Sequence, residues 1–444
     1  MNNLNFLVDV LKESPVFKTL EKNVKPGRTV CASGLSTINK SNIIYALCRL
    51  KGVTAFCLAS DEKEAQTLCN DLSCMGLRAY VYPVRDFNFL DFQSRSHEYE
   101  HARLKVLLKL LNHECDVAIA CVDAAAQLTV PRNVLEQSVI EFEEGRELSL
   151  EKATKALTLL GYERFDAVEG SGQFSLRGGI LDFFMPDSDY PVRCEFWGDE
   201  ITDLSYFDIE TQRRFKKADK ITLSPSTEIV IEDRAALADK IEHKAKLLRS
   251  KNSAKAKEKL FSEAELIRSG AMIANADKFI NQIYDKPESL FDYLDRNTLV
   301  FASEFTAIQE RGKSMDFISN ETLMQGFEDG TLCRGFDRFA LTFNECTEFL
   351  QSHGTIVLEN FVHGSMPIKL SEIISFSTKQ LSAWGGSYKQ LKEDVDGLFT
   401  PESKGVIFAG TERAAKNLCD TFNADGINAV YSEGADKISK GELL

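Results

Sequence analysis

The amino-acid sequence predicts an α/β protein. We expect a degenerate P-loop-like parallel-sheet domain that is interrupted by an α+β insert and followed by a small α/β domain. Apolar strands alternate with amphipathic helices near both ends of the chain, as in βαβ units with parallel strands. A segment close to the P-loop pattern follows an early apolar stretch. The middle of the chain has short strands with partial alternation, separated by Gly, Pro and Asp turns.

The first βαβ unit spans residues 52–82. Gly52–Ala59 is a continuous apolar run, which is typical of a buried parallel strand. Asp61–Met75 is expected to be a helix and Arg78–Tyr82 the next strand. The apolar face of that helix consists of Ala65, Leu68, Cys69 and Leu72.

The segment from Gly34 to Ser41 (GLSTINKS) matches G-x-x-x-x-G-K-[ST] except at Asn39, which replaces the second glycine. A working P-loop wraps backbone amides around phosphates, which requires glycine. Lys40 and Ser41 would supply the phosphate charge and the magnesium ligand. Asn tolerates the left-handed region, but the β-branched Ile38 resists it. We therefore interpret the segment as an eroded P-loop with a structural role, and weak phosphate binding remains the alternative.

A P-loop ATPase also needs an acidic strand end that holds magnesium. The candidate strand, residues 298–304 (TLVFASE), ends in Ser303 and Glu304 where a working site has Asp-Glu. Two defects in one site predict that this chain has no catalytic residues and binds no ATP, magnesium or other metal as a cofactor. The predicted degenerate nucleotide site comprises Gly34, Asn39, Lys40, Ser41, Ser303 and Glu304.

Residues 97–101 (HEYEH) formally match the zinc motif H-E-x-x-H. On a helix, His97 and His101 would share a face and Glu98 could act as a general base. The sequence indicates no third ligand, so we interpret the segment as the start of a surface helix.

The insert contains two expected strand regions, Phe174–Phe184 and Val192–Trp197. Arg193 and Glu195 lie two positions apart and therefore share a face of a strand, as would Arg177 and Phe183 if they lay on one strand. Arginine beside an aromatic residue is typical of interface anchors. Ion pairs that merely stabilise the fold are the alternative.

Helix is expected to return at residues 232–283, followed by a strand at 299–302. Residues 240–259 are locally basic, and we expect a solvated helix face there, with contact to a phosphate backbone as the alternative. A second βαβ unit follows near the end of the chain. Its strands are expected at 405–409 and 427–431, around a helix that carries Ala414, Leu418 and Phe422.

The composition is that of a soluble multidomain protein, because 444 residues predict about three domains. The 53 basic and 67 acidic residues leave a net charge of −14, which argues against a large nucleic-acid-binding face. Eleven cysteines without a C-x-x-C pair indicate a reduced protein. With no signal peptide or membrane-length apolar run, we expect a cytoplasmic monomer.

Several motifs occur in order through the insert: GYER at 161–164, GQFSLRGGILDFF at 172–184, YPVRCEFWGDEI at 190–201, FD at 207–208 and TQR at 211–213. Flanking segments agree, namely YPVRD at 82–86 and LSPSTEI at 223–229. This series resembles the UvrB-homology region at the N-terminus of bacterial transcription-repair coupling factors (Mfd), over most of residues 20–330. A damage-probing hairpin of the UvrB type is not evident after Arg85, where residues 87–92 are too few to form it.

The resemblance implies a division of the chain into four segments. Residues 1–125 and 220–380 would form a UvrB-like domain whose ATPase motifs are degenerate. Residues 126–219 would form a UvrA-binding insert, and residues 381–444 a small variable α/β domain, with a truncated form of that domain as the alternative. The translocase motor, with its ATP and magnesium, and the contacts with RNA polymerase and DNA would lie in regions absent here.

The resemblance also implies a function and a set of binding residues. The chain would recruit UvrA to stalled RNA polymerase for nucleotide excision repair, without catalysis of its own. An ATP-dependent DNA-processing enzyme of the UvrB type, a damage-recognition helicase, is the rival hypothesis, and a scaffold that holds the motor inactive is a third. The implied UvrA-binding residues are Arg164, Arg177, Phe183, Arg193 and Glu195.

Overall fold

The computed structural model describes residues 4–85, 97–249, 253–270, 276–330, 332–361, 366–379, 381, 384–432 and 438–444. Residues 87–92, where no damage-probing hairpin is expected, lie outside the described residues. Within the described part of the chain, no helix is both long and apolar enough to cross a membrane.

The largest body is built on a seven-stranded parallel sheet, with strand order β15-β1-β14-β13-β2-β4-β3. The α/β prediction and the parallel sheet are therefore confirmed. The strands are β1 (Val30–Ser33), β2 (Ala55–Ala59), β3 (Ala79–Val81), β4 (Val117–Cys121), β13 (Leu299–Ser303), β14 (Thr355–Glu359) and β15 (Glu372–Ser375).

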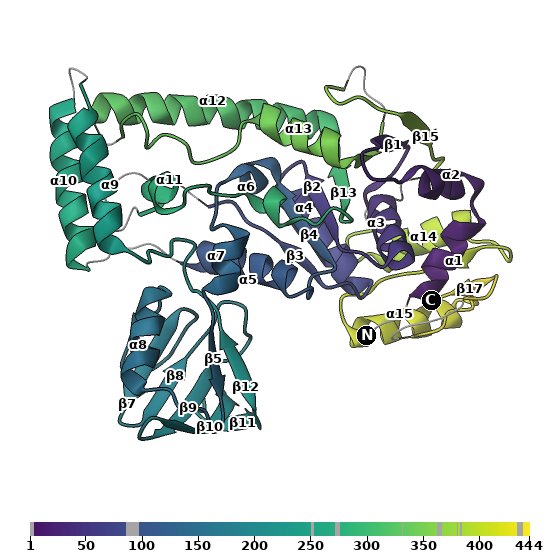
Figure 1. The fold of residues 1–444 in the computed structure, drawn as a ribbon. Helices are drawn as coiled ribbons and strands as arrows, with labels where there is room; N and C mark the ends of the chain where they lie inside the picture. Colours follow the sequence, from purple (N-terminus) through teal and green to yellow (C-terminus); the bar gives the residue numbers. More distant parts are fainter. Residues whose placement is uncertain are drawn as a thin grey trace.

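Helices cover both faces of this sheet (Figure 1). Successive residues of β2 point to opposite faces of the sheet. Cys57 belongs to the hydrophobic cluster that one group of helices covers, whereas Phe56 and Leu58 belong to the cluster that a second group covers. The first group is α1 (Asn5–Glu13), α2 (Pro15–Asn23), α3 (Thr37–Lys51) and α4 (Glu62–Cys74). The second group is α5 (Glu98–Leu111), α6 (Val122–Ala126), α7 (Arg132–Gln137), η1 (Ala276–Phe279), α11 (Ile280–Ile283), η2 (Leu290–Tyr293), α12 (Phe305–Asp329) and α13 (Phe343–His353).

Two antiparallel helices, α9 (Arg234–Leu247) and α10 (Ser253–Ser269), form an arm at the far end of α12 (Figure 1). Their facing sides bury a separate small core that includes Ile241, Leu260 and Phe336. The described parts of the basic stretch, residues 240–249 and 253–259, lie on this arm. Lys240 contacts the Gln282 carbonyl oxygen at 3.2 Å, so at least part of the stretch faces the protein itself.

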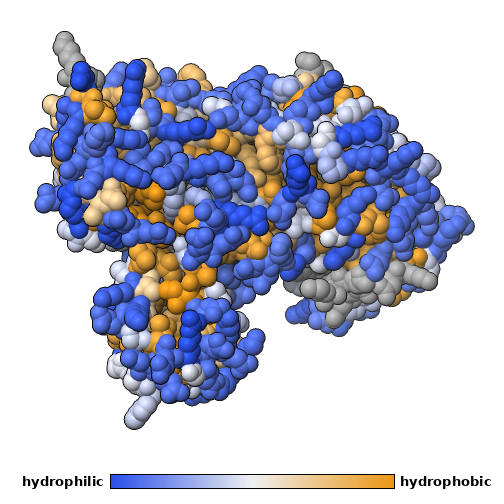
Figure 2. Space-filling view, viewed as in Figure 1, coloured by the Kyte–Doolittle hydropathy of each residue, from blue (hydrophilic) through white to orange (hydrophobic). Residues whose placement is uncertain are grey.

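The insert forms a second body with a six-stranded sheet, order β11-β10-β9-β8-β7-β6, and an antiparallel pair β5–β12. Its own hydrophobic core lies between the sheet and α8. Its elements are β5 (Ile140–Glu143), α8 (Leu150–Leu159), β6 (Glu163–Arg164), β7 (Gln173–Arg177), β8 (Ile180–Phe183), β9 (Val192–Trp197), β10 (Glu200–Phe207), β11 (Arg214–Lys217) and β12 (Lys220–Leu223). Figure 1 shows this body projecting from the main one, and Figure 2 shows apolar side chains at the neck between them.

The last part of the described chain contains α14 (Tyr388–Leu398), β16 (Lys404–Gly405), α15 (Glu412–Ala424) and β17 (Glu442–Leu443). The predicted helix is confirmed, but the two predicted strands are much shorter than expected. Ala429 forms a bridge to Leu443 rather than to the first strand, because β17 lies between the two. This interposed strand comes from residues that carry no apolar run.

Candidate functional site

The loop between β1 and α3 contains the predicted P-loop, and it is short. Helix α3 already begins at Thr37, and the Lys40 amide donates to the Ser36 carbonyl oxygen at 3.1 Å. The Leu35 amide donates to the Glu359 carbonyl oxygen at 3.0 Å. Two backbone amides in the range that a P-loop directs at phosphates are therefore bonded within the protein.

Gly34 is the one residue of this loop that requires glycine. Its φ of +78° is disfavoured for other residues, and an added Cβ would clash with the carbonyl oxygen of Phe376. Thr378 donates to the Gly34 carbonyl oxygen at 2.6 Å. The glycine thus permits close approach of another segment of the chain.

The Lys40 side chain is buried and is held by residues at the end of β13 and in the first turn of α4. Its ammonium nitrogen lies 2.5 Å from Glu304 Oε1, 3.0 Å from Ser303 Oγ and 3.5 Å from Glu64 Oε1. Only 4% of the side chain is exposed. The structure therefore brings together three of the predicted residues, with the lysine charge neutralised by carboxylates.

The other two side chains of the motif also have partners. Asn39 donates to Ser36 Oγ at 2.7 Å, and Ser41 donates to Asp71 Oδ2 at 2.9 Å. Burial raises the pKa of Asp71, which the Ser41 hydroxyl partly counteracts. Ser41, in the position of a magnesium ligand, is therefore hydrogen-bonded to Asp71 of α4, a helix on the same face of the sheet as α3.

Two carboxylates of this edge, Glu64 and Glu359, were missed by the sequence reasoning. Glu359 ends β14 fully buried, and its Oε1 accepts from the Phe305 amide at 2.8 Å. Burial raises the pKa of Glu359 to about 7, and the nearby Glu304 carboxylate adds to the rise. Glu304 has a left-handed backbone conformation, with φ at +56°. The members of this cluster lie far apart in the sequence. They become neighbours only in the folded protein, where the carboxyl ends of the parallel strands lie side by side.

The HEYEH segment starts α5 and lies at the junction with the insert. The His97 and His101 rings stack with centroids 5.9 Å apart, and His97 Nδ1 lies 2.9 Å from Glu100 Oε2. Glu100 Oε1 accepts from the Thr227 hydroxyl and the Glu228 amide, both at 2.8 Å. Burial would raise the pKa of Glu100, but the His97 contact, the charge of Arg85 and these hydrogen bonds hold it at about 2. This segment therefore secures the chain where it returns from the insert, a role that the motif alone does not indicate.

A buried ion pair completes the junction. Arg103 is fully buried and donates to Glu228 Oε1 at 2.6 Å and Oε2 at 3.3 Å. The guanidinium also lies over the Tyr82 ring, 4.1 Å from its centroid. Thr129 donates to Glu228 Oε2 at 2.7 Å. One carboxylate thus ties α5, the segment after α6 and the segment after β12 to one another.

On the insert, the predicted shared face of Arg177 and Phe183 is wrong. The two residues lie on different strands, β7 and β8, joined by a tight turn at Gly178 and Gly179. Phe183 pairs with Phe174 and is fully buried in the insert core, whereas Arg177 lies on the opposite, outward face with 49% of its side chain exposed. These two glycines form the turn of a hairpin, so the alternation of faces along a single strand does not relate Arg177 to Phe183.

The outward face is organised by Asp182, which is 1% exposed. Arg193 donates to both of its oxygens at 2.8 Å, and Arg177 donates to Oδ2 at 2.7 Å. The Arg193 guanidinium also lies over the Phe207 ring, 4.4 Å from the centroid. Arg193 is therefore largely committed to the fold, while Arg177 keeps a solvent-facing side.

Arg193 and Glu195 share the outward face of β9, as the spacing predicts. Glu195 forms an ion pair with Arg214 rather than with Arg193. Trp197 continues the same face and is 82% exposed. Arg164 is also exposed, on β6 at the other edge of the sheet. The sequence reasoning missed Asp182, Arg214 and Trp197, although an exposed tryptophan two positions beyond Glu195 follows from the same alternation.

Comparison with known proteins shows what this chain is similar to. A family model described as "UvrB interaction domain" matches residues 140–229. The transcription-repair-coupling factor of Bacillus subtilis (strain 168) is 25% identical over 447 residues, covering 98% of this chain and 38% of that protein. The same factor is 24% identical in Staphylococcus epidermidis (RP62A), over 82% of this chain and 31% of that protein, and 21% identical in Staphylococcus aureus (MRSA252), over 94% and 36%.

This chain resembles the N-terminal region of the transcription-repair coupling factor. The resemblance predicted from the ordered motifs is confirmed. The matched range of the interaction domain begins with β5 and ends at Ile229, after the junction segment that Glu100 holds. The chain spans less than two fifths of the length of these coupling factors.

Proposed function

We propose that this chain is the recruiting part of a transcription-repair coupling factor, and that it binds UvrA through the outward face of its insert. The observation that best supports this is the match of residues 140–229 to the UvrB interaction domain. That range coincides with a body that has its own core and projects from the parallel-sheet body. In the complete protein, RNA polymerase and DNA would bind through regions beyond this chain.

The outward face has the composition of a binding surface. Arg177 is half-exposed and already oriented by Asp182, so its remaining donors are preorganised for a carboxylate on the partner. Trp197 offers a large aromatic surface that is almost fully exposed, and Trp and Arg are the residue types most enriched among interface hot spots. Phe183 would contribute indirectly, as core support for the strand that bears Asp182.

We further propose that the chain hydrolyses no nucleotide. For a phosphate to occupy the loop after β1, Lys40 would have to leave Glu304 and the first turn of α3 would have to open. The phosphate would also meet the carboxylates of Glu64 and Glu359. The rival hypothesis, an ATP-dependent enzyme of the UvrB type, requires all of these changes.

The recruitment proposal is tested by measuring UvrA binding to the wild-type chain and to Arg177→Ala, Arg193→Glu and Trp197→Ala. We expect binding by the wild type and a loss of about tenfold or more in each variant. Arg146→Ala is the matched control, because Arg146 is also a half-exposed, ion-paired arginine of the insert but lies between β5 and α8. Unchanged binding in the variants would refute the assigned face. A chain that binds a motor fragment but has no affinity for UvrA would favour the scaffold hypothesis instead.

A magnesium-dependent ATP titration tests the second part of the proposal. We expect no tight binding by the wild-type chain. Tight, magnesium-dependent binding that is lost in Lys40→Met would restore the enzyme hypothesis.

A further inference from the structure

The amino ends of the parallel strands, opposite the eroded P-loop, hold two neighbouring pockets. The loops that precede β1, β2, β13 and β14 form the first pocket, with a volume of about 240 Å³. The loops before β2, β3, β4 and β13 form the second, with a volume of about 450 Å³. Val53, Asn297 and Thr298 line both pockets, so the two are continuous along this edge.

The first pocket, called here the basic pocket, is lined by positively charged side chains and by no negatively charged ones among the described residues. The chain as a whole, by contrast, has a net charge of −14. Apolar side chains line much of the rest of the pocket, including Val53, Leu299 and Ile356. Its cationic lining residues are Lys25, Arg28, Lys51 and Arg296.

Two of these cations are uncommitted. Arg28 pairs with Glu372 at 3.2 Å, and Lys51 lies 4.0 Å from Glu21. Lys25 and Arg296 are exposed and have no ion-pair partner in the described part of the chain. Two of the four cations of the basic pocket therefore have no acidic partner among the described residues, and an anionic ligand would be attracted to them.

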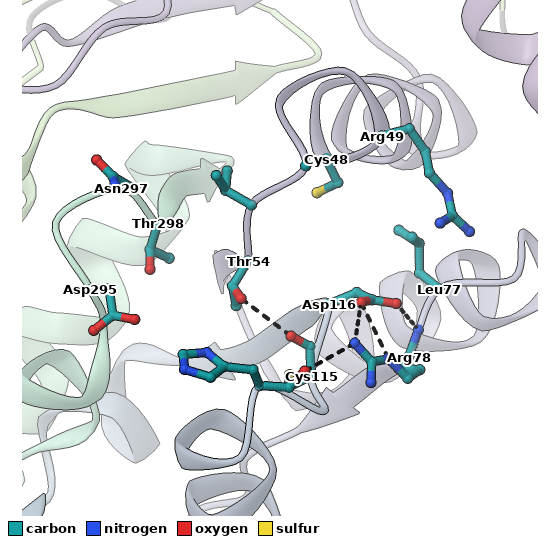
Figure 3. Close-up of a pocket in the computed structure, with 13 residues that line it drawn as sticks. Cys48, Arg49, Thr54, Leu77, Arg78, Cys115, Asp116, Asp295, Asn297 and Thr298 are labelled. Carbon is teal, nitrogen blue, oxygen red and sulfur yellow. Dashed lines mark hydrogen bonds and ion pairs between the residues drawn. The ribbon is translucent and has the colours of Figure 1, made fainter.

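The second pocket has matched charges. Arg78 and Asp116 form an ion pair at 2.8 Å, and the Asp116 carboxylate also accepts from the Arg78 amide (Figure 3). Asp295, Asn297 and Thr298 line the opposite wall (Figure 3). Its volume lies within the usual range for small-molecule sites. The matched charges favour a neutral polar group rather than a second anion.

We propose that this edge binds a phosphate-bearing ligand, with the phosphate in the basic pocket and the attached polar group in the second pocket. The charge distribution across the sheet supports this. The carboxyl ends of the strands, where open α/β sheets usually bind phosphates, present Glu64, Glu304 and Glu359. The cations lie at the amino ends. A free nucleotide and the backbone of a nucleic acid share this chemistry, and an experiment separates them.

Binding of ADP, pyrophosphate and a short single-stranded DNA without terminal phosphates to the full chain would be measured at low salt without magnesium. We expect at least one of the three to bind. The affinity should fall by about tenfold or more in Lys25→Ala/Arg296→Ala, because each lost charge-assisted contact costs about that factor. Binding of ADP or pyrophosphate identifies a free phosphate as the source, and binding of DNA alone identifies the backbone.

Lys152→Ala/Lys313→Ala is the matched control, since it removes the same charge from exposed positions on α8 and α12. The proposal is overturned if none of the three probes binds, if the pocket variant binds like the wild type, or if the control loses as much affinity. It is also overturned if binding depends on Lys40, which lies at the opposite edge. UvrA binding by the pocket variant should equal that of the wild type, so this proposal and the recruitment proposal can fail independently.

Discussion

Replacing Glu359 by Gln should stabilise the parallel-sheet body above neutral pH. The folded protein raises the pKa of Glu359 from 4.5 to about 7 through burial and the Glu304 carboxylate. Below pH 4.5 both folded and unfolded states carry the proton, and the shift costs nothing. Between pH 4.5 and 7 the unfolded chain releases the proton first, so stability falls as the pH rises. Above pH 7 the full cost applies, about 3 kcal/mol at roughly 1.4 kcal/mol per pKa unit.

Glutamine keeps the hydrogen-bond acceptor of this side chain and removes its charge. Its carbonyl oxygen can still accept from the Phe305 amide, and its NH₂ group would occupy the place of Oε2, which has no hydrogen-bond partner. The amide can also donate toward Glu304. We therefore expect near-equal stability at pH 4.5 and a gain for the variant at pH 8.

Calorimetric melting and hydrogen exchange of the β14 amides at pH 5, 6.5 and 8 would measure this. A gain of about 3 kcal/mol in a body of this size corresponds to roughly 6–10 °C in Tm. Glu348→Gln is the control, because Glu348 is exposed on α13 and undergoes the same change of charge. If Glu359→Gln lost stability in parallel with the wild type from pH 5 to 8, the titration argument would be refuted. A variant less stable at every pH would mean that the ionised carboxylate stabilises the fold.

Three further predictions, on five variants, test the geometry. Lys40→Met should destabilise the body by about 3 kcal/mol in urea denaturation at pH 7, because it leaves the partly buried carboxylates of Glu64 and Glu304 without their counter-charge. Phe183→Ala should cost about 3–5 kcal/mol and abolish the insert's melting transition, whereas Trp197→Ala should weaken UvrA binding with melting unchanged. Gly34→Ala should cost more than about 2 kcal/mol, since it adds a clash to a positive φ, whereas Gly52→Ala, with a positive φ but open space, should cost less; equal losses would show that the clash is unimportant.

The regular elements could be predicted because their signal is local. The helix after β2 and the strand β13 lie within one residue of the predicted positions, and β2 ends at the predicted residue but begins three residues later, at Ala55. The exceptions are residues whose partners are distant. β17 has no apolar run of its own, and it is a strand because it pairs with β16 and Ala429.

The candidate sites show the same limit. The sequence pattern could identify Lys40 as unusual, but not that Glu64 and Glu304 would neutralise it, since that depends on strand order in the sheet. In the insert, the period of two placed Arg193 and Glu195 on one face. The same period failed for Arg177 and Phe183 because a two-glycine hairpin intervenes. Periodicity therefore holds within an element and gives no information across a turn.

The net charge of −14 illustrates why composition cannot locate a binding site. Acidic residues surround Lys40 at the carboxyl ends of the strands, and cations without an acidic partner in the described part of the chain line the opposite edge of the same sheet. The average over the chain argues against an extended nucleic-acid-binding face, and nothing in the structure reverses that. A pocket of about 240 Å³ is smaller than such a face and requires only a few local charges. An acidic protein can therefore hold one phosphate, and the charge that matters is the one within a Debye length of the site.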